Sequence, residues 1–272
     1  MKNLTSSETH TVIVGNQLDG RGNPGFAFRN PSAPIFYDWH DHPCHQITYA
    51  KRGVTQIEGP DGWHLLPTAH AIWIPAETRH RTMIRNLDGV SVYFDPTHFP
   101  ADHPAQILTF PVTAMLKEML FYTLRWPAGA TEQHPVAQSF FHTLSLLCLE
   151  HMLAKHEGVF RLPRATNPSL IRAMDTTLAD PGSANLALAL KQAGMSERSF
   201  RRHFHDETGM TWQEWATQAR LFRAATMLAE GLRVTDVAAE VGYASLSAFA
   251  KAFTQLFGMS PTHYRKLQTG NE

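Results

Sequence analysis

The chain has 272 residues, of which 43% are hydrophobic, and its formal net charge at pH 7 is zero. This length and composition suit two folded domains and exclude a disordered chain. The sequence has neither an apolar stretch of about 20 residues nor an apolar signal segment at its start, so we expect a cytoplasmic protein without a membrane partner. Two cysteines, Cys44 and Cys148, are too few for a disulfide scaffold and fit a reducing compartment.

The first hundred residues alternate short apolar segments with turn residues. We expect strands over residues 12–14, 46–49, 54–57, 71–74 and 90–94. The run Gly59-Pro-Asp-Gly62 predicts the tight turn of a hairpin. Strands this short, punctuated by turn residues, predict a β-sandwich or small barrel over residues 1–110.

Beyond Pro111 the apolar residues take helical spacing. The first run contains Met115, Leu116, Met119 and Leu120, and a second run covers residues 134–157. The helical segment 111–160 either covers one face of the sheet or packs against a second copy of the protein, and both alternatives stay open. Two prolines between residues 158 and 168 end this run and indicate a linker between domains.

Residues 168–272 predict an all-α domain of about seven helices. The first begins at Pro168, where proline is favoured at a helix start, and ends before Pro181. The others are expected over residues 185–193, 196–206, 211–230, 234–241, 245–257 and 261–267. Gly231 is expected to cap the long helix 211–230, which would join two halves of the domain.

A pattern occurs twice in this region, with its serine and phenylalanines at a constant spacing. Its first copy contains Gly194, Ser196, Phe200 and Phe204, and its second contains Gly242, Ser245, Phe249 and Phe253. In each copy a short apolar helix stops at a glycine, and a serine then starts a second helix. This is the layout of a helix-turn-helix, so we expect two such units, at about 185–206 and 234–257, that contact duplex DNA at two successive places.

The two copies differ in charge. From Arg164 onward the chain has 12 Lys and Arg against 10 Asp and Glu, and three of these cations lie together in the first unit. Ser196 caps the first recognition helix, and Arg198, Arg201 and Arg202 face away from the phenylalanines, where arginine can bind guanine bidentately. The second helix presents Ser245, Leu246, Ser247, Ala250 and Lys251.

The second helix is therefore expected to bind DNA through shape and methyl contacts and to discriminate sequences less. The alternative interpretation is an ordinary α-helical domain whose arginines are solvated surface residues. The repeated glycines, serines and phenylalanines, together with the isolated cation cluster, favour the DNA-binding interpretation.

Residues 185–267 resemble the DNA-binding domain of AraC/XylS-type transcription regulators. The matching residues are Ser196-Glu-Arg-Ser-Phe-Arg-Arg-His-Phe204, Thr208-Gly, Trp215, Arg220, Ala224, Leu228, Val237-Ala-Ala-Glu-Val-Gly-Tyr243, Phe253, Phe257-Gly-Met-Ser-Pro261 and Tyr264-Arg265. The resemblance implies two helix-turn-helix units on a long connecting helix that read adjacent major grooves. The sequence departs from the family at Leu246 and Ala250, where polar residues are common.

A histidine-rich stretch, Trp39-His-Asp-His-Pro-Cys-His-Gln46, precedes the second predicted strand. If this stretch is extended, His40, His42, Cys44 and Gln46 share one face by the period of two. Converging imidazoles are ready ligands for a divalent transition metal. His80 lies at a further strand end.

Residues 28–95 resemble the two motifs of the cupin barrel, with His40, His42, Gln46, Pro75 and His80 at matching positions. The resemblance implies one divalent transition metal held by His40, His42, Gln46 and His80, although Gln46 replaces the usual carboxylate and Glu77 the usual glycine. A metal-free pocket for an organic effector, formed by these histidines with Trp39, Cys44, Tyr49 and Trp73, is an alternative. Cys44 would be a fourth metal ligand or a thiol sensor, and a third interpretation makes the histidines purely structural.

The predicted fold class is α+β multidomain: an N-terminal cupin-like β-barrel followed by helices, then an all-α domain with two helix-turn-helix units. The predicted function is a sequence-specific transcription regulator that binds double-stranded promoter DNA, senses a small molecule or metal, and contacts RNA polymerase if it activates. No dedicated general base is identified, so we do not expect an enzyme. A metal-dependent cupin enzyme and a ligand-independent architectural DNA-binding protein are the alternatives, and dimerisation through 134–157 is a further expectation.

Overall fold

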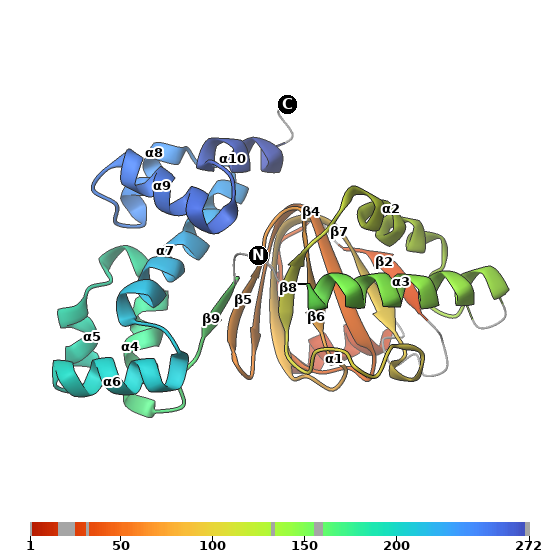
Figure 1. The fold of residues 1–272 in the computed structure, drawn as a ribbon, viewed down its shortest axis with the longest axis horizontal. Helices are drawn as coiled ribbons and strands as arrows, with labels where there is room; N and C mark the ends of the chain where they lie inside the picture. The colour runs from red at the N-terminus through yellow and green to blue at the C-terminus, as the bar shows by residue number, and fades with distance from the viewer. Residues whose placement is uncertain (1, 16–24, 31–32, 132–133, 155–159, 270–272) are drawn as a thin grey trace. The chain divides into compact units, whose positions relative to one another are not determined.

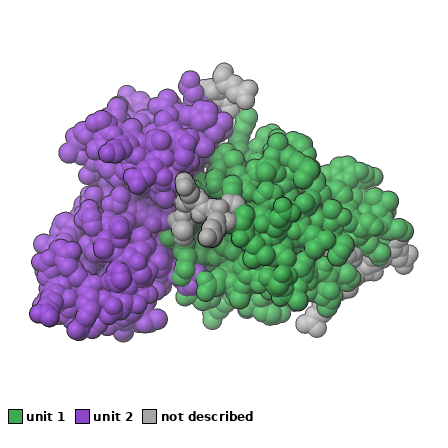
Figure 2. Space-filling model, viewed as in Figure 1, with its two compact units in different colours: residues 1–60, 64–161 green, residues 61–63, 162–272 purple. Residues whose placement is uncertain are grey.

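The computed structural model describes residues 2–15, 25–30, 33–131, 134–154 and 160–269. They fall into two compact units, residues 1–60 with 64–161 and residues 61–63 with 162–272 (Figure 2). Unit 1 is rich in strands and unit 2 is helical (Figure 1). This confirms the predicted class of a β-rich N-terminal part followed by an all-α C-terminal part. The unit boundary falls after residue 161, so the helical segment 111–160 belongs to unit 1.

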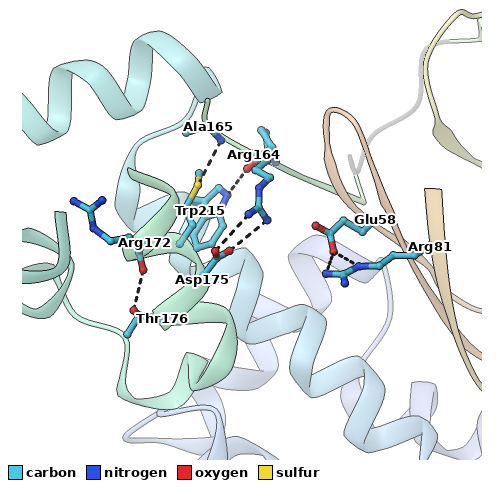
Figure 3. A network of polar contacts seen from close by, with 10 residues as sticks. Glu58, Arg81, Arg164, Ala165, Arg172, Asp175, Thr176 and Trp215 are labelled. Carbon is cyan, nitrogen blue, oxygen red and sulfur yellow. Dashed lines mark hydrogen bonds and ion pairs between the residues drawn. The ribbon is translucent and has the colours of Figure 1, made fainter. Parts of the chain in front are cut away.

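The strands described belong to one mixed sheet with the order β1-β3-β7-β4-β5-β9, in which β2 also pairs with β7 and β6 pairs with β4 and β8. Their bounds are β1 (Lys2–Asn3), β2 (Phe26–Arg29), β3 (Ile35–His40), β4 (His45–Gly59), β5 (Gly62–Leu66), β6 (His70–Ile74), β7 (His80–Phe94), β8 (Leu108–Pro111) and β9 (Arg161–Pro163). The long antiparallel pair β4 and β7 runs from His45 opposite Phe94 to Glu58 opposite Arg81. The Arg81 guanidinium donates to the Glu58 carboxylate across this pair (Figure 3).

The strands predicted at 46–49 and 54–57 are one strand, so their separation was wrong. Arg52 and Gly53, between the two predicted strands, form an irregularity inside β4, where the register to β7 shifts on both sides of Arg52. Gly53 has a φ of +83°, which a bulge can require and which side chains disfavour. The turn predicted at 59–62 is confirmed, because β4 ends at Gly59 and β5 begins at Gly62.

The strand predicted at 12–14 is wrong, because these residues belong to helix α1 (Ser6–Gly15). The Thr5 backbone N–H and hydroxyl both donate to the Glu8 carboxylate, and the Glu8 N–H donates back to Thr5 Oγ1. This reciprocal capping starts the helix. Thr9 and Ile13 are buried, and the Thr9 hydroxyl accepts from the backbone of Asp38 in β3.

Helices α2 (Ala114–Tyr122) and α3 (Pro135–Leu153) cover one face of the sheet, the first of the two alternatives left open. Short 3-10 helices lie at η1 (Pro96–His98) and η2 (Thr123–Arg125). One buried cluster joins the helices to the strands through Ile47, Trp73, Val92, Phe94, Leu116, Leu120, Phe141, Leu144 and Cys148. Burial of this apolar area is the main stabilising term of unit 1.

Unit 2 consists of α4 (Pro168–Ala179), η3 (Pro181–Ser183), α5 (Leu186–Ala193), α6 (Glu197–Thr208), α7 (Trp212–Ala229), α8 (Val234–Glu240), α9 (Leu246–Phe257) and α10 (Pro261–Thr269). Helix α7 runs between one group formed by α4, α5 and α6 and another formed by α8, α9 and α10 (Figure 1). The predicted helices agree closely with these bounds. None of the described helices is both long and apolar enough to cross a bilayer.

Contacts around Trp215 fix the start of unit 2 (Figure 3). The Trp215 indole N–H donates to the Pro163 carbonyl at 2.9 Å, which joins α7 to the segment before α4. Arg164 forms an ion pair with Asp175 of α4, and its guanidinium lies 4.6 Å from the centre of the Trp63 ring. The first half of the domain is therefore built around α7.

Candidate nucleic-acid interface

The first helix-turn-helix unit forms as its local sequence predicts. The Asn185 side chain accepts from the Leu188 N–H and starts α5, which ends at Gly194. Gly194 has a φ of +65°, the left-handed conformation that terminates helices and favours glycine. Ser196 Oγ then accepts from the Ser199 N–H and starts α6.

One face of α6 is anchored in the core. Phe200 and Phe204 are fully buried and stack on each other with ring centres 5.6 Å apart. They pack on Trp212 and Trp215 at the start of α7. Since helical residues three and four positions apart share a face, burying these two rings turns the intervening positions outward. The exposed basic residues of α6 are Arg198, Arg201, Arg202 and His205, and its exposed acidic residues are Glu197 near its start and Asp206 and Glu207 near its end.

The three arginines differ in their contacts. Arg201 forms an ion pair with Glu197 one turn earlier, at 2.8 Å, and both side chains are 55% exposed. An exposed pair of this kind contributes about 0.5 kcal/mol or less, so breaking the ion pair when Arg201 contacts DNA would cost little free energy. The Arg202 guanidinium lies 3.3 Å from His203 Nε2. Arg198 has no hydrogen bond or ion pair to any residue that the structure describes.

The second unit repeats the scaffold with one change in the turn. Gly242 follows α8 with a φ of +80°, and Tyr243 and Ala244 separate it from Ser245, whereas only Met195 separates the first glycine from its serine. Ser245 Oγ accepts from the Ala248 N–H and starts α9. Buried rings anchor α9 beside α10, namely Phe249, Phe253, Phe257 and Tyr264.

The outward face of α9 is much less cationic than that of α6. Leu246, Ser247 and Lys251 are exposed, and Ala250 is half-buried. Leu246 is 47% exposed although it is apolar. The two faces therefore offer different chemistry: three guanidinium groups on α6, and one ammonium group with methyl and hydroxyl groups on α9.

The repeat continues into the helix that follows each recognition helix. Thr211 caps α7 in a reciprocal pair with Glu214, and Ser260, the matching position of the second copy, accepts from the His263 N–H at the start of α10. Trp215 and Tyr264 correspond in the same way and pack under the two phenylalanine pairs. The repeated sequence pattern predicts the caps, but only the structure reveals the correspondence between these two different rings.

The histidines of unit 1 come together differently from the sequence prediction. His40 ends β3 and His80 begins β7, and they are cross-strand partners with ring centres 4.2 Å apart. The His42 ring lies 5.3 Å from that of His80. Residues 41–44 form a bend between β3 and β4, so the expected extended stretch from His40 to Gln46 is wrong. Cys44 is buried instead in a cluster with Ile13, Phe26 and Tyr93.

Backbone carbonyls hold the rings of two of these histidines. Nδ1 of His40 donates to the Asp38 carbonyl, and Nδ1 of His80 donates to the Thr78 carbonyl, both at 2.7 Å. Burial lowers the pKa of His40 to about 4 and holds the pKa of His80 well below its usual value. Both rings are therefore neutral at pH 7, and Nε2 of each is an acceptor.

His42 is engaged by its neighbours. Its Nδ1 donates to the Cys44 carbonyl at 2.7 Å, and its Nε2 lies 2.9 Å from the side-chain amide of Gln46. The Gln46 atom that faces His42 is Oε1. The Gln46 amide nitrogen donates to Thr48 Oγ1 at 2.8 Å, and burial lowers the pKa of His42.

The predicted metal ligands are thus near one another, but they do not form the four-ligand site that the cupin resemblance implies. Within the described ranges, no three His, Cys, Asp or Glu side chains are placed to hold one ion. Gln46 Oε1 and His42 Nε2 already contact each other, and the Gln46 amide nitrogen donates to Thr48. Of the predicted ligands, His40 and His80 have an Nδ1 held by a backbone carbonyl, as in metal-binding histidines, and both line a cavity.

A cavity of about 60 Å³ lies beside these histidines. Its lining residues come from α1, β2, β3, β4 and β7, and they are Val12, Ile13, Phe28, Asn30, Tyr37, His40, Gln46, His80, Thr82, Ile84, Ser91 and Tyr93. Positions 80, 82 and 84 of β7 follow the period of two, a signal that the sequence contained. Asn30 Oδ1 is buried and has no hydrogen-bond partner among the described residues, so it adds an acceptor to the lining.

Four residues predicted for the pocket do not line this cavity. The Trp73 indole donates to the Pro104 carbonyl, Tyr49 packs on Phe121, and Trp39 lies beside Arg81. Cys44, the fourth, is in the cluster named above. These positions lie outside the cavity because cross-strand pairing, which is not local in sequence, decides which face of a strand turns inward.

Comparison with known proteins matches residues 189–267 to the helix-turn-helix domain family. The regulator NimR of Escherichia coli is 24% identical over 229 residues, which cover 83% of this chain and 81% of NimR. Residues 189–267 of this chain are therefore a DNA-binding helix-turn-helix domain of the AraC type. The transcriptional activator RhaR of Escherichia coli is 32% identical to this chain over 117 residues.

That match to RhaR covers 39% of this chain and 42% of RhaR, so the chain spans about two fifths of that relative. The crystal structure of ToxT from Vibrio cholerae covers 92% of this chain and 99% of its own, with 12% identity and a TM-score of 0.39. A score this low does not bear on the fold of the regulator.

Proposed function

We propose that this AraC-type regulator recognises promoter DNA chiefly through α6 and uses α9 mainly as an anchor. The observation that supports this is the exposed face of α6, where Arg198, Arg201 and Arg202 lie opposite two fully buried phenylalanines. In the major groove an arginine can bind O6 and N7 of guanine together, which distinguishes one base pair from the others. Helix α9 offers Leu246 to thymine methyl groups and Lys251 to a phosphate.

Selection from a random pool of DNA duplexes tests this function even though the operator sequence is unknown. We expect the purified protein to enrich a site with two parts about one helical turn apart, the first more strongly specified than the second. Arg198→Ala should enrich the same site less well, whereas Arg79→Ala in unit 1 is a matched control that should behave as the wild type. Recovery of no preferred sequence by the wild-type protein would reject the proposal.

We infer that unit 1 senses a small ligand in the cavity beside His40 and His80. The neutral imidazoles and the Asn30 carbonyl all present acceptors, so the proposed effector is a small molecule that donates hydrogen bonds. An effector that favours one arrangement of the chain over another would shift the population that is competent to bind DNA.

Small amides and alcohols, with carboxylates of matched size, are suitable probes for this cavity. The donors should raise the melting temperature of the wild-type protein and change its affinity for the selected duplex, whereas the carboxylates should do neither. Asn30→Ala should abolish the response. A stronger response to carboxylates would contradict the assigned polarity, and consumption of a probe would point to an enzyme instead.

Metal binding at His40 and His80 is the second candidate, because both rings are oriented by backbone carbonyls as metal ligands are. If a divalent transition metal is held, the purified protein should contain it in stoichiometric amount, and His40→Ala or His80→Ala should remove it. His98→Ala, an exposed histidine outside the cavity, is the control and should retain the metal. Metal-free wild-type protein would reject this candidate.

A homodimer through α3 is also proposed, because Val136, Leu146 and Leu153 leave apolar area on the outer side of this helix. A dimer would double the DNA contacts and set the distance between sites. The mass in solution should then rise with concentration, and Leu153→Ser should shift it toward the monomer. A mass independent of concentration, both free and on DNA, would reject the dimer.

If the protein activates, transcription by RNA polymerase in a purified system should increase when it is added.

A further inference from the structure

The two halves of unit 2 touch at a place other than the connecting helix. Gly182, in the short η3 between α4 and α5, lies against the backbone at the end of α8. A Cβ atom added to Gly182 would overlap the Glu240 carbonyl oxygen, and one added to Gly242 would overlap the Gly182 carbonyl oxygen. The two backbones are therefore as close as glycine alone allows, and we call this the Gly182–Gly242 contact.

Arg220 holds this segment in place from α7. Its Nε donates to the Pro181 carbonyl at 3.0 Å, and its Nη2 donates to the Ala184 carbonyl at 2.5 Å. The Asp180 carboxylate accepts from the Ser183 N–H at the other side of η3. The charged donor is half-buried, and hydrogen bonds of this kind are stronger than those between neutral groups.

The position of η3 matters because it leads directly into the first helix-turn-helix unit. Helix α5 begins at Leu186, shortly after η3 ends at Ser183, and α6 follows α5 after a tight turn. The end of α8 leads in the same way through Gly242 into α9. A shift at the Gly182–Gly242 contact would therefore change the distance and angle between α6 and α9.

We propose that the Gly182–Gly242 contact and Arg220 set the spacing at which α6 and α9 can bind two successive major grooves at once. The inference rests on the proposed function, since it requires that both helices enter DNA. With α7 as the sole connection, the two halves could bend relative to each other, and ordering them on DNA would reduce affinity. A second attachment orders them beforehand. Gly182, Gly242 and Arg220 are thus positioning residues that need not touch DNA.

Gly182→Ala is the sharpest test, because the φ of Gly182 is not in the left-handed region and the substitution adds only the overlap with Glu240. The two backbones would have to separate by about 1 Å to reach van der Waals contact. The probe is the duplex that the wild-type protein selects from a random pool, with one base pair inserted or removed between its two parts. Each change alters both the distance and the rotation between the two grooves.

The wild-type protein should lose about three- to tenfold in affinity when the spacing changes by one base pair, which is the share that the weaker sequence preference of α9 contributes. Gly182→Ala should bind the selected duplex more weakly and should lose no more than about twofold on the same change, or should prefer a new spacing. Arg220→Met should also weaken the dependence of affinity on spacing. This variant provides the test if Gly182→Ala does not fold. A general loss of stability would weaken binding at all spacings alike and leave the preference unchanged.

Gly258→Ala is the matched control for such a loss. Gly258 has a φ of +69° and open space around its Cβ position, so alanine there should lower the melting temperature without altering the spacing preference. Folded Gly182→Ala and Arg220→Met proteins with the wild-type spacing preference would overturn the inference. If instead the wild-type protein selects no DNA, the proposed function fails and this inference fails with it.

Discussion

The two helix-turn-helix units of this regulator share a scaffold but differ in the surface that they present. Both have a left-handed glycine, a serine cap and two fully buried phenylalanines at matching positions. Their outward faces carry three arginines in one case and a leucine, a serine and a lysine in the other. The difference teaches that folding constrains the buried and capping positions, whereas the exposed positions are left to determine what each unit binds.

The largest expected effect concerns the shared scaffold. Phe204→Ala and Phe253→Ala, at matching positions, should each lower the free energy of unfolding of unit 2 by about 3 to 5 kcal/mol, because each removes a ring with no exposed surface. Hydrogen exchange of the amides in unit 2 measures this. If the two losses of unfolding free energy differ by more than about 2 kcal/mol, the width of this range, the two scaffolds are not equivalent.

The next prediction distinguishes base recognition by α6 from phosphate contact by α9. Arg201→Ala or Arg202→Ala should cost about 1 to 3 kcal/mol in specific binding and relax the preference at one base pair. Lys251→Ala should weaken binding to all sequences alike and lower the salt dependence by one phosphate contact. Affinities for the selected duplex and its single-base variants at two salt concentrations measure both. Unchanged affinity in both arginine variants would remove α6 from the recognition surface.

The helix caps should contribute equally. Ser196→Ala and Ser245→Ala each remove the acceptor for one N–H at the start of a recognition helix, which should lower the free energy of unfolding by about 1 kcal/mol. Urea unfolding followed by circular dichroism measures the loss. Ser247→Ala, which removes a hydroxyl contact to Ser245 but no acceptor of a backbone N–H, is the control. A larger loss of DNA affinity than of stability at Ser196 would indicate that its hydroxyl also binds a phosphate.

The smallest effect distinguishes the rings below the two phenylalanine pairs. Tyr264 is buried and its hydroxyl has no hydrogen-bond partner among the described residues, whereas the Trp215 indole donates to Pro163. Tyr264→Phe should therefore leave the melting temperature unchanged or raise it by a few degrees, since it removes a buried polar group. Trp215→Phe should lower it, because the Pro163 carbonyl loses its donor. Destabilisation by Tyr264→Phe would show that its hydroxyl is satisfied.

The helices of unit 2 are easier to predict from sequence than the strands of unit 1 for a physical reason. Helix starts and ends in unit 2 depend on local signals, such as Asn185, Ser196 and Gly194, that act within one turn. The same kind of signal is present in unit 1 at Thr5 and Glu8, but the apolar run Val12-Ile-Val14 favours a strand and masks it.

The cavity in unit 1 could not be predicted from the chain in the same way. Which face of each strand turns inward depends on register and on the irregularity at Gly53, and both are set by pairing with β7, which is distant in sequence. Motif spacing identifies His40 and His80, and the structure makes them cross-strand partners. Asn30 and Tyr37 have no motif that marks them, and the aromatic residues predicted for the pocket lie in the core or nearer the surface.

The claim that one unit reads and the other anchors is tested most directly by a base-substitution scan of the selected duplex. Each base pair is replaced in turn, and the affinity of the wild-type protein and of Arg202→Ala is measured for every duplex. We predict that penalties of about 1 to 3 kcal/mol concentrate in one part of the site and that Arg202→Ala abolishes at least one of them there. Equal losses of affinity in both parts of the site would contradict the account. So would larger losses in the part where Arg202→Ala has no effect.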